Sequence, residues 1–486
     1  MNGTDMAPFT AWLPARPTQD YDLIVKIVGV GAGTLFKGWA PIAQYLADQG
    51  LAAMAQYGRL NGEYGDLVLH VRIATQSFSS MGYGCDVLVL LEDSRPELRQ
   101  FHLQPGSVLL WESPTELPRE MTLPEGVIVY QIPGGKFDSE LSEGLLGRGA
   151  RALGALLQIL GMPEESLHRL TPSLTAPQSF MSGWNYASSA ITKRDAYSLS
   201  CSSIPDAPVR MPLTPHQAIM LGYAVSSCDC RASCDRELVA SPAKWTATHL
   251  GLAGAMVSGL ESERHPGVQV YRGPKGKVMA LLRGDDSSIA SCLAGLTSPR
   301  VFVAADIPDV FKLIVAGHEL VEGGMSDGVA VLIEETVALR QQNIDLCALV
   351  DAIRHRKTFV QDTGRPHQAD AVATMAEWDE NDRAEVGFVA WGAAQGVVRD
   401  AVALCRSFGL QTAAFYPKRI VPFSGEEMES FAKTVDRVVI VESGQTQGYW
   451  DRLRPSFSFE SAILTPSPGK LLTPMDIFLR EGLGAV

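Results

Sequence analysis

The sequence has no apolar stretch long enough to cross a lipid bilayer. Its longest strongly apolar segment, 245–260, is shorter than the roughly 20 residues that a membrane-spanning helix needs, so we expect a buried helix there. Residues 1–22 lack the basic start and apolar core of a secretory leader. These absences predict a cytoplasmic protein without a membrane span.

Basic residues are also in short supply. The chain has 41 Lys+Arg against 54 Asp+Glu, which gives a formal net charge of −13. A nucleic-acid-binding protein needs a basic surface, so we exclude that class. We find no solenoid-length repeat and no low-complexity tract. The composition, 46% hydrophobic and 20% charged, is that of a globular protein, and the length suggests about three domains.

Cysteine is sparse and is expected to be reduced. The chain has 8 cysteines in 486 residues, and without a secretion signal a disulfide framework is not indicated. Cys228, Cys230 and Cys234 form a cluster on a predicted loop. Thiolates at such spacing could share a soft metal or an iron–sulfur cluster. The alternative, which we favour, is three partly buried thiols, because the spacing matches neither Cys-x₂-Cys pairs nor the bacterial ferredoxin run.

Short β-branched runs alternate with helical patterns, which predicts an α/β fold with parallel sheets. We expect three domains, at 21–170, 216–353 and 384–486, joined by hydrophilic linkers at 171–215 and 354–383. The expected strands are 22–28, 67–73, 86–91, 127–132, 278–282, 301–304, 329–333, 386–390 and 437–442. The expected helices are 35–49, 147–160, 216–225, 243–259, 310–322, 394–408 and 425–432.

A glycine-rich turn follows the first expected strand. Gly29, Gly31 and Gly33 lie between that strand and a helix, so backbone amides at the turn could cradle a phosphate. The spacing is not Gly-x-Gly-x-x-Gly, and we find no acidic ribose partner about twenty residues on. A tight strand-to-helix turn without a ligand is the alternative.

The first domain resembles the gamma domain of 2-oxoacid:ferredoxin oxidoreductases. The matching residues are the glycine turn at 29–33, Gln-Tyr-Gly-Arg at 56–59 and His-Val-Arg-Ile at 70–73. Two details differ from that family. The usual Gly-Gly-Gln-Gly loop is Gly-Ala-Gly-Thr at 31–34, and Glu63 and Asp66 lie where arginine is expected. Carboxylates at these positions would repel the phosphates of coenzyme A.

The other two domains resemble parts of the same enzymes. The second is similar to their pyrimidine-binding domain, closest to alpha subunits of the indolepyruvate type, on Asp-Asp-Ser-Ser at 285–288 and the segment 306–333. The third looks like their transketolase C-terminal-like domain, on Trp391-Gly392 and 438–448. The order, gamma then alpha, resembles the fused alpha subunits of the 2-oxoglutarate type.

The resemblance implies a function and a set of partners. It implies a heteromeric enzyme that oxidatively decarboxylates a 2-oxoacid, an aryl or bulky one by the indolepyruvate likeness, to an acyl-CoA with reduction of ferredoxin. It implies thiamine diphosphate with Mg²⁺, coenzyme A as substrate, and a beta subunit that carries the diphosphate site and a [4Fe-4S] cluster. This chain alone would not complete the reaction.

Two elements of the family's thiamine site are replaced. The family's Tyr-Pro-Ile-Thr-Pro-Ser turn, which contacts the 2-oxoacid, is the cysteine-containing segment 227–234 here. The family also has a glutamate that hydrogen-bonds the aminopyrimidine, but no acidic residue lies between Glu237 and Glu261. These departures favour a second hypothesis, a catalytically divergent scaffold or electron-transfer subunit of such a complex.

Five further residues are candidates for the site, each with a simpler alternative. His249 is nearest the missing glutamate and could relay a proton, or it is a buried core histidine. Arg231 could bind a substrate carboxylate, or it lies exposed on the surface. Asp285 and Asp286 follow a strand end, where ligands bind in α/β sheets, although one could cap a helix. Gln445 could meet a cofactor or partner, or belong to a polar turn.

Overall fold

The computed structural model describes most of the chain, which forms two compact units. These are unit 1, Met1–Pro212 with Gly469–Leu471, and unit 2, Leu213–Pro468 with Leu472–Val486. The described residues are 21–29, 31–59, 66–91, 98–118, 121–134, 144–171, 174, 176–199, 210–227, 262–265, 268–272, 277–282, 296–345, 377–379, 384–423, 425–443, 449–466 and 471–482.

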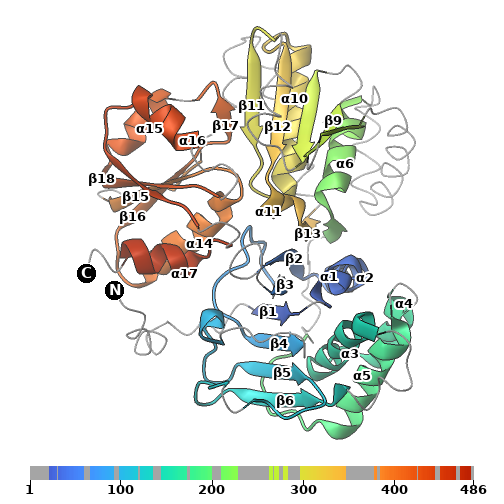
Figure 1. Ribbon diagram of the computed structural model, residues 1–486. Helices are drawn as coiled ribbons and strands as arrows, with labels where there is room; N and C mark the ends of the chain where they lie inside the picture. Colours follow the sequence, from blue (N-terminus) through green and yellow to red (C-terminus); the bar gives the residue numbers. More distant parts are fainter. Residues whose placement is uncertain are drawn as a thin grey trace. The chain divides into compact units, whose positions relative to one another are not determined.

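Unit 1 is a sheet with its α-helices on one face (Figure 1). Its strands are β1 (Asp22–Val28), β2 (Ala52–Arg59), β3 (Leu67–Ala74), β4 (Val87–Leu91), β5 (Val108–Glu112) and β6 (Ile128–Ile132), and β7 (Arg210–Leu213) follows at the unit boundary. Its helices are α1 (Ala32–Lys37), α2 (Ala40–Asp48), η2 (Leu98–Phe101), α3 (Gly144–Ile159), η4 (Glu164–Ser166), α4 (Leu167–Leu170) and α5 (Pro177–Ala190).

The strands of unit 1 lie in the order β6-β5-β4-β1-β3-β2. Strands β1, β4, β5 and β6 are parallel, whereas β3 is antiparallel to both of its neighbours, β1 and β2. The parallel part confirms the predicted fold class. The antiparallel part arises because β2 and β3 follow one another with no helix between them, and only an antiparallel pair can be joined by a short connection.

The two faces of this sheet are covered differently. Side chains such as Val25, Leu69 and Val89 point toward the helices and form one core. Alternate residues such as Val28, Leu88 and Trp111 point to the other side, where they pack against η2 and against loop residues that include Leu103, Leu117 and Leu123. Because both faces are covered, the parallel strands are mostly apolar rather than alternating.

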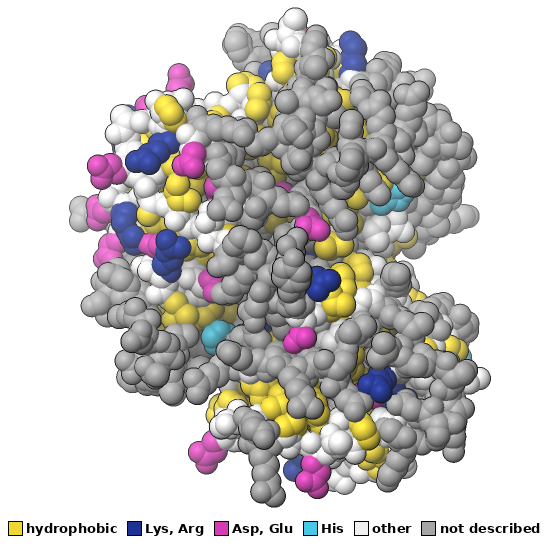
Figure 2. Space-filling model, in the orientation of Figure 1, with side chains coloured by type: hydrophobic (Ala, Val, Ile, Leu, Met, Phe, Trp, Pro, Cys, Tyr) yellow, Lys and Arg dark blue, Asp and Glu magenta, His cyan; other side chains and the backbone are white. Residues whose placement is uncertain are grey.

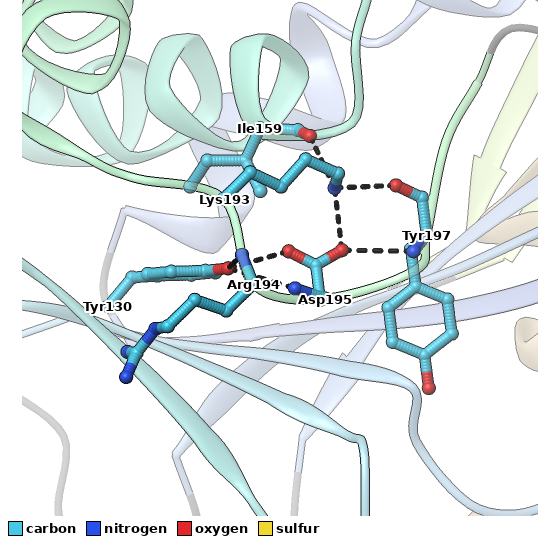
Figure 3. Close-up of polar contacts among 6 residues, drawn as sticks. All are labelled: Tyr130, Ile159, Lys193, Arg194, Asp195 and Tyr197. Atoms are coloured by element: carbon cyan, nitrogen blue, oxygen red, sulfur yellow. Dashed lines mark hydrogen bonds and ion pairs between the residues drawn. The ribbon is translucent and has the colours of Figure 1, made fainter.

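A polar cluster fastens the segment after α5 to the edge strand β6 (Figure 3). The Lys193 ammonium donates to Asp195 Oδ1 at 2.6 Å, to the Ile159 carbonyl at 2.8 Å and to the Tyr197 carbonyl at 2.7 Å. The Tyr130 hydroxyl of β6 donates to Asp195 Oδ2 at 2.8 Å. Burial raises the pKa of Tyr130. The Asp195 side chain is thus a central acceptor, and it is fully buried.

Replacing Asp195 with Ala is expected to lower the free energy of unfolding of unit 1 by about 2–3 kcal/mol, because the buried Tyr130 hydroxyl and the Lys193 ammonium lose a charged acceptor. Urea unfolding followed by hydrogen exchange of α3 and β6 peptides measures the loss. Glu165→Ala, in the exposed turn η4, is the control and should change little. A loss below 0.5 kcal/mol for Asp195→Ala would show that the cluster is incidental.

Unit 2 contains two sheets, each with its own core. The first has the order β17-β11-β12-β10-β9-β8, with β10, β12 and β11 parallel and the others antiparallel. Its strands are β8 (Ser262–His265), β9 (Val268–Arg272), β10 (Val278–Leu282), β11 (Pro299–Val303), β12 (Gly328–Ile333) and β17 (Arg419–Val421), and the helices of this part of the chain are α6 (Pro215–Ser227), α10 (Ile307–Glu322) and α11 (Glu335–Ala338). Strand β13 (Arg340–Asp345) also belongs to unit 2 but is not a strand of this sheet.

The second sheet has the order β14-β16-β15-β18-β19, parallel except for β14. Its elements are β14 (Glu377–Asp379), β15 (Ala384–Ala390), α14 (Ala394–Ser407), β16 (Thr412–Tyr416), α15 (Gly425–Ala432), β18 (Val435–Val441), α16 (Tyr449–Leu453), η6 (Arg454–Ser456), β19 (Ser461–Leu464), α17 (Pro474–Ile477) and η7 (Phe478–Gly482). Strand β17 lies between β16 and α15 in the chain, yet pairs with β11 of the first sheet.

The surface over the second sheet carries both charges. Glu426 and Lys433 beside α15, and Asp436 and Arg437 in β18, are exposed. Acidic and basic side chains lie intermingled over this part of the face drawn in Figure 2. None of the helices in the described ranges is both long and apolar enough to cross a membrane.

The range predicted as a linker, 171–215, contains helix α5. This helix packs closely against α3, and its buried residues include Phe180 and Trp184. The second predicted linker, 354–383, lies outside the described residues except for β14. The three domain boundaries stay a prediction.

Candidate functional site

The glycine turn that sequence analysis singled out lies at the carboxyl end of β1. Gly29 has a φ of 134°, which residues with a side chain rarely adopt. Its amide donates to the Leu67 carbonyl at 2.9 Å, and its carbonyl accepts from the Ala32 amide at 3.0 Å. The chain therefore turns sharply out of the sheet and enters α1.

Close packing explains why the second position of the turn, Gly31, is a glycine. A Cβ atom at Gly31 would lie 2.9 Å from Leu91 Cδ1 and 3.2 Å from the Cα of Gly149 in α3. The Gly31 carbonyl in turn lies 3.1 Å from where a Cβ of Gly149 would be. The turn and α3 touch backbone to backbone, so Gly31 is required by the fold whether or not a ligand binds.

The third glycine adjoins an aromatic pair. A Cβ atom at Gly33 would lie 3.0 Å from the Tyr57 hydroxyl. The Tyr57 ring stacks on Phe36 with centroids 5.9 Å apart, and both rings are half-buried. Burial raises the pKa of Tyr57, and the positive charge of Arg59 opposes that shift. Tyr57 is therefore a neutral donor at pH 7, with an exposed guanidinium two residues along β2.

We define Gly33, Phe36, Tyr57 and Arg59 as the glycine-turn site. Aromatic rings can stack on a flat heterocycle, and a guanidinium can pair with a phosphate. The site lies at the carboxyl end of β1, the edge where α/β sheets bind ligands. Sequence analysis expected two carboxylates, Glu63 and Asp66, to repel an anionic ligand. Asp66 lies immediately before β3. Glu63 lies outside the described residues.

A buried ion pair that sequence analysis missed lies at the same edge of the sheet. Arg151 Nη1 of α3 donates to Glu112 Oε1 at the end of β5 at 2.7 Å, and to the Gly134 carbonyl at 3.1 Å. Both side chains are 1% exposed. The only signal in the sequence is a glutamate that follows the apolar run 108–111. The pair joins β5, α3 and the end of β6, which makes it structural.

Another buried polar centre lies in unit 2, where the carboxyl ends of parallel strands from its two sheets meet. Asp309 Oδ1 and Oδ2 accept from Lys418 Nζ at 2.8 and 3.0 Å. Glu334, after β12, accepts from the Ala393 amide at 2.7 Å and from the Ser443 hydroxyl. These contacts cross from one sheet to the other.

Burial shifts the ionisation of this centre. It raises the pKa of Asp306 to about 6, helped by the negative charge of Asp309. Burial would also raise the pKa of Asp309, but Lys418 holds it below its usual value. Burial lowers the pKa of Arg340 to about 10, so the guanidinium stays charged at pH 7. Sequence analysis found no sign of this centre.

The other predicted site residues lie outside the described residues. They are Cys228, Cys230, Arg231, Cys234, His249, Asp285, Asp286 and Gln445. Of the predicted set, the structure therefore locates Gly29, Gly31 and Gly33 alone. Within the described ranges, no group of three or more His, Cys, Asp or Glu side chains could hold a metal ion.

Comparison with known proteins identifies the fold. The sequence matches no protein-family model and no curated protein. Among solved structures, the chain is similar to a 2-oxoglutarate:ferredoxin oxidoreductase from Magnetococcus marinus, solved with 2-oxoglutarate, coenzyme A and succinyl-CoA bound. The identity is 18% and the TM-score 0.65, over 94% of this chain and 98% of that one. This likeness shows that the two chains share a fold over nearly their whole lengths.

A second similarity covers a smaller part of the chain. The gamma subunit of a keto/oxoacid ferredoxin oxidoreductase from Geobacter sulfurreducens matches with 20% identity and a TM-score of 0.27. The match covers 35% of this chain and 98% of that one.

Proposed function

We propose that this chain is a subunit of a heteromeric 2-oxoacid:ferredoxin oxidoreductase-like complex in the cytoplasm. The observation that carries the proposal is the full-length match to a chain of a 2-oxoglutarate:ferredoxin oxidoreductase. The reaction would be oxidative decarboxylation of a 2-oxoacid, an aryl or bulky one by the sequence likeness, to an acyl-CoA with reduction of ferredoxin. A beta subunit would carry the iron–sulfur cluster and the diphosphate–Mg²⁺ site.

In this proposal the glycine-turn site of unit 1 binds coenzyme A as a substrate. Phe36 and Tyr57 provide half-buried rings against which an adenine could stack. Arg59 is the exposed cation beside them and would pair with a phosphate. The Tyr57 hydroxyl, neutral at pH 7, would donate to a phosphate or ribose oxygen.

Arg59→Met is expected to weaken coenzyme A binding about ten-fold, which corresponds to the loss of one charge-assisted contact of about 1.4 kcal/mol. Isothermal titration of the intact chain with coenzyme A measures the change. Arg454→Met, which removes an exposed arginine from η6 of unit 2, is the matched control and should bind like the natural protein. Equal affinity of both variants for coenzyme A would show that Arg59 does not contact this ligand.

Thiamine diphosphate fits this chain less well than it fits the family pattern. The carboxylate expected beside the aminopyrimidine is missing between Glu237 and Glu261, and that region lies outside the described residues. His249 as proton relay, Arg231 as carboxylate ligand, and Asp285, Asp286 and Gln445 as site residues are proposals that rest on the sequence.

The missing carboxylate favours a second candidate function. In that case the chain is a divergent scaffold or electron-transfer subunit of a related complex. Cys228, Cys230 and Cys234 would then be the residues to hold a cluster. Iron and sulfide analysis of the anaerobically purified chain tests this. If the natural protein binds iron and the Cys228→Ser variant does not, the result supports an electron-transfer subunit. If the natural protein contains no iron, the scaffold is the version of this candidate function that is supported.

The two candidates differ in the activity of the native complex. A tagged chain is purified anaerobically from its host with its partners, and viologen reduction is measured with aliphatic and aryl 2-oxoacids. Reduction that requires both a 2-oxoacid and coenzyme A supports the enzyme. No reduction by a complex that is saturated with thiamine diphosphate and Mg²⁺ contradicts it and favours the scaffold.

A further inference from the structure

Five charged side chains meet where the two sheets of unit 2 face each other. Asp306 and Asp309 begin α10 after β11, Glu334 follows β12, Arg340 begins β13, and Lys418 precedes β17. All five are buried or half-buried. We call them the charge cluster.

The charge cluster includes the polar contacts that join the two sheets. The Asp309–Lys418 ion pair links α10 to the strand connection β16–β17. Beside it, the amide of Val303 in β11 donates to the Lys418 carbonyl at 2.9 Å. Glu334 links β12 to the segments after β15 and β18 through Ala393 and Ser443. Opening this junction would separate both links at once.

The cluster holds more negative than positive charge. Three carboxylates share two cations, and Lys418 is committed to Asp309 by two contacts of 2.8 and 3.0 Å. Asp306 is left with a backbone contact, since its Oδ1 accepts the Asp309 amide at 2.9 Å as the cap of α10. Arg340 attracts Asp306 and Glu334 alike, and its Nη1 donates to the Ala305 carbonyl at 3.3 Å.

Among the described residues, the charges that act on Asp306 are those of Asp309, Lys418 and Arg340. Helix α6, which packs along α10, has His216 and Tyr223 as its titratable residues. Both bond elsewhere, because His216 pairs with the Tyr271 hydroxyl and Tyr223 donates to the Tyr271 and Val278 carbonyls. Strands β10 and β12 contain no charged residue. Lys312, on α10, acts on Asp309.

We infer that the charge cluster is a proton-sensitive latch, in which uptake of one proton by Asp306 tightens the hold between the two sheets of unit 2. The added proton neutralises the excess carboxylate and ends its repulsion of Asp309. Asp309 then keeps Lys418 without a like charge beside it. The latch concerns the junction of the sheets and acts whether or not the proposed enzyme function is correct.

The sign of the pH dependence follows from the ionisation of Asp306. Its pKa is about 6 in the folded chain against 3.8 for the free side chain. The closed latch therefore binds a proton that the open one does not, and the stabilisation grows as pH falls through 6. Between pH 7 and pH 5 the closed-to-open ratio should rise about ten-fold.

Hydrogen exchange of the full chain tests the latch. Protection factors, corrected for intrinsic rates, are followed at the amides of Val303, Ala305 and Asp309, each of which bonds within the junction. We expect a rise of about ten-fold from pH 7 to pH 5. In Asp306→Asn the cap acceptor is kept and the titration is lost, so protection should be high and equal at both pH values.

Two further variants separate the latch from general effects. Asp327→Asn removes a carboxylate whose hydrogen bonds hold its pKa at about 2, so the slope between pH 7 and pH 5 should persist. Lys418→Met should lower protection at Val303 at both pH values. The amides of α3 in unit 1 serve as a contrast. Burial lowers the pKa of His70 from 6.5 to about 3 in the folded chain, so acid favours the unfolded state of unit 1, and protection of α3 should fall from pH 7 to pH 5. A flat profile in the natural protein, or an unchanged slope in Asp306→Asn, would overturn the inference.

Discussion

Replacing Arg151 with Met is expected to lower the free energy of unfolding of unit 1 by about 3–5 kcal/mol. The substitution keeps most of the side-chain volume but leaves the Glu112 carboxylate, 1% exposed, without the guanidinium that lies 2.7 Å from it. A buried carboxylate that loses its cation must either ionise in a poor environment or take up a proton. Urea unfolding followed by hydrogen exchange of β5 and α3 peptides measures the loss.

The double variant Glu112→Gln with Arg151→Met separates charge from packing. It removes both charges, so much of the lost stability should return, because replacing a whole buried pair is far less costly than breaking it. If the single and double variants are equally unstable, the side-chain packing of Arg151 rather than its charge holds the strands.

Replacing Gly154 or Gly183 with Ala is expected to lower the free energy of unfolding of unit 1 by about 3 kcal/mol each. A Cβ at Gly154 of α3 would lie 2.0 Å from the Phe180 carbonyl oxygen of α5, and a Cβ at Gly183 would lie 2.0 Å from the Arg151 carbonyl oxygen. The obstacle in both cases is backbone, which cannot rotate away. The helices would have to separate along their shared face.

The matched control for these variants is Gly425→Ala at the start of α15. A Cβ there would have Phe457 Cε1 at 3.8 Å as its nearest neighbour, an ordinary contact, so stability should stay within about 1 kcal/mol. Thermal unfolding with hydrogen exchange of α3 and α5 peptides separates the cases. Wild-type protection of both helices in Gly154→Ala would contradict the close crossing.

Apolar runs predicted much of the secondary structure, but several boundaries were wrong for physical reasons. The predicted helix 35–49 is two helices, because Gly38 interrupts it and Pro41 begins a new one. The strand β2 was missed since Ala-Ala-Met-Ala has no β-branched residue, and β5, Val-Leu-Leu-Trp-Glu, was also missed. Helix α10 begins at Ile307 rather than 310, because Asp306 caps it.

The sequence predicted where the glycine turn lies in the fold, but not which residues from other elements contact it. The pattern of Gly29, Gly31 and Gly33 identifies a strand-to-helix turn, but nothing local indicates that Gly31 meets Gly149 from α3. Ion pairs were invisible for the same reason. Glu112 and Arg151 are 39 residues apart in sequence, and Asp309 and Lys418 are 109 apart. Charged residues are expected at the surface, so their burial shows only in three dimensions.

Strand β17 has a consequence for how the chain is synthesised. It occupies the edge of a sheet whose neighbouring strand, β11, was made roughly 120 residues earlier. Until Val421 leaves the ribosome, β11 exposes unpaired backbone groups that could pair with another chain. Contacts of such sequence separation form slowly, since a long loop must close first. The first sheet of unit 2 therefore completes its fold only after β14, β15, α14 and β16 of the second sheet have been made.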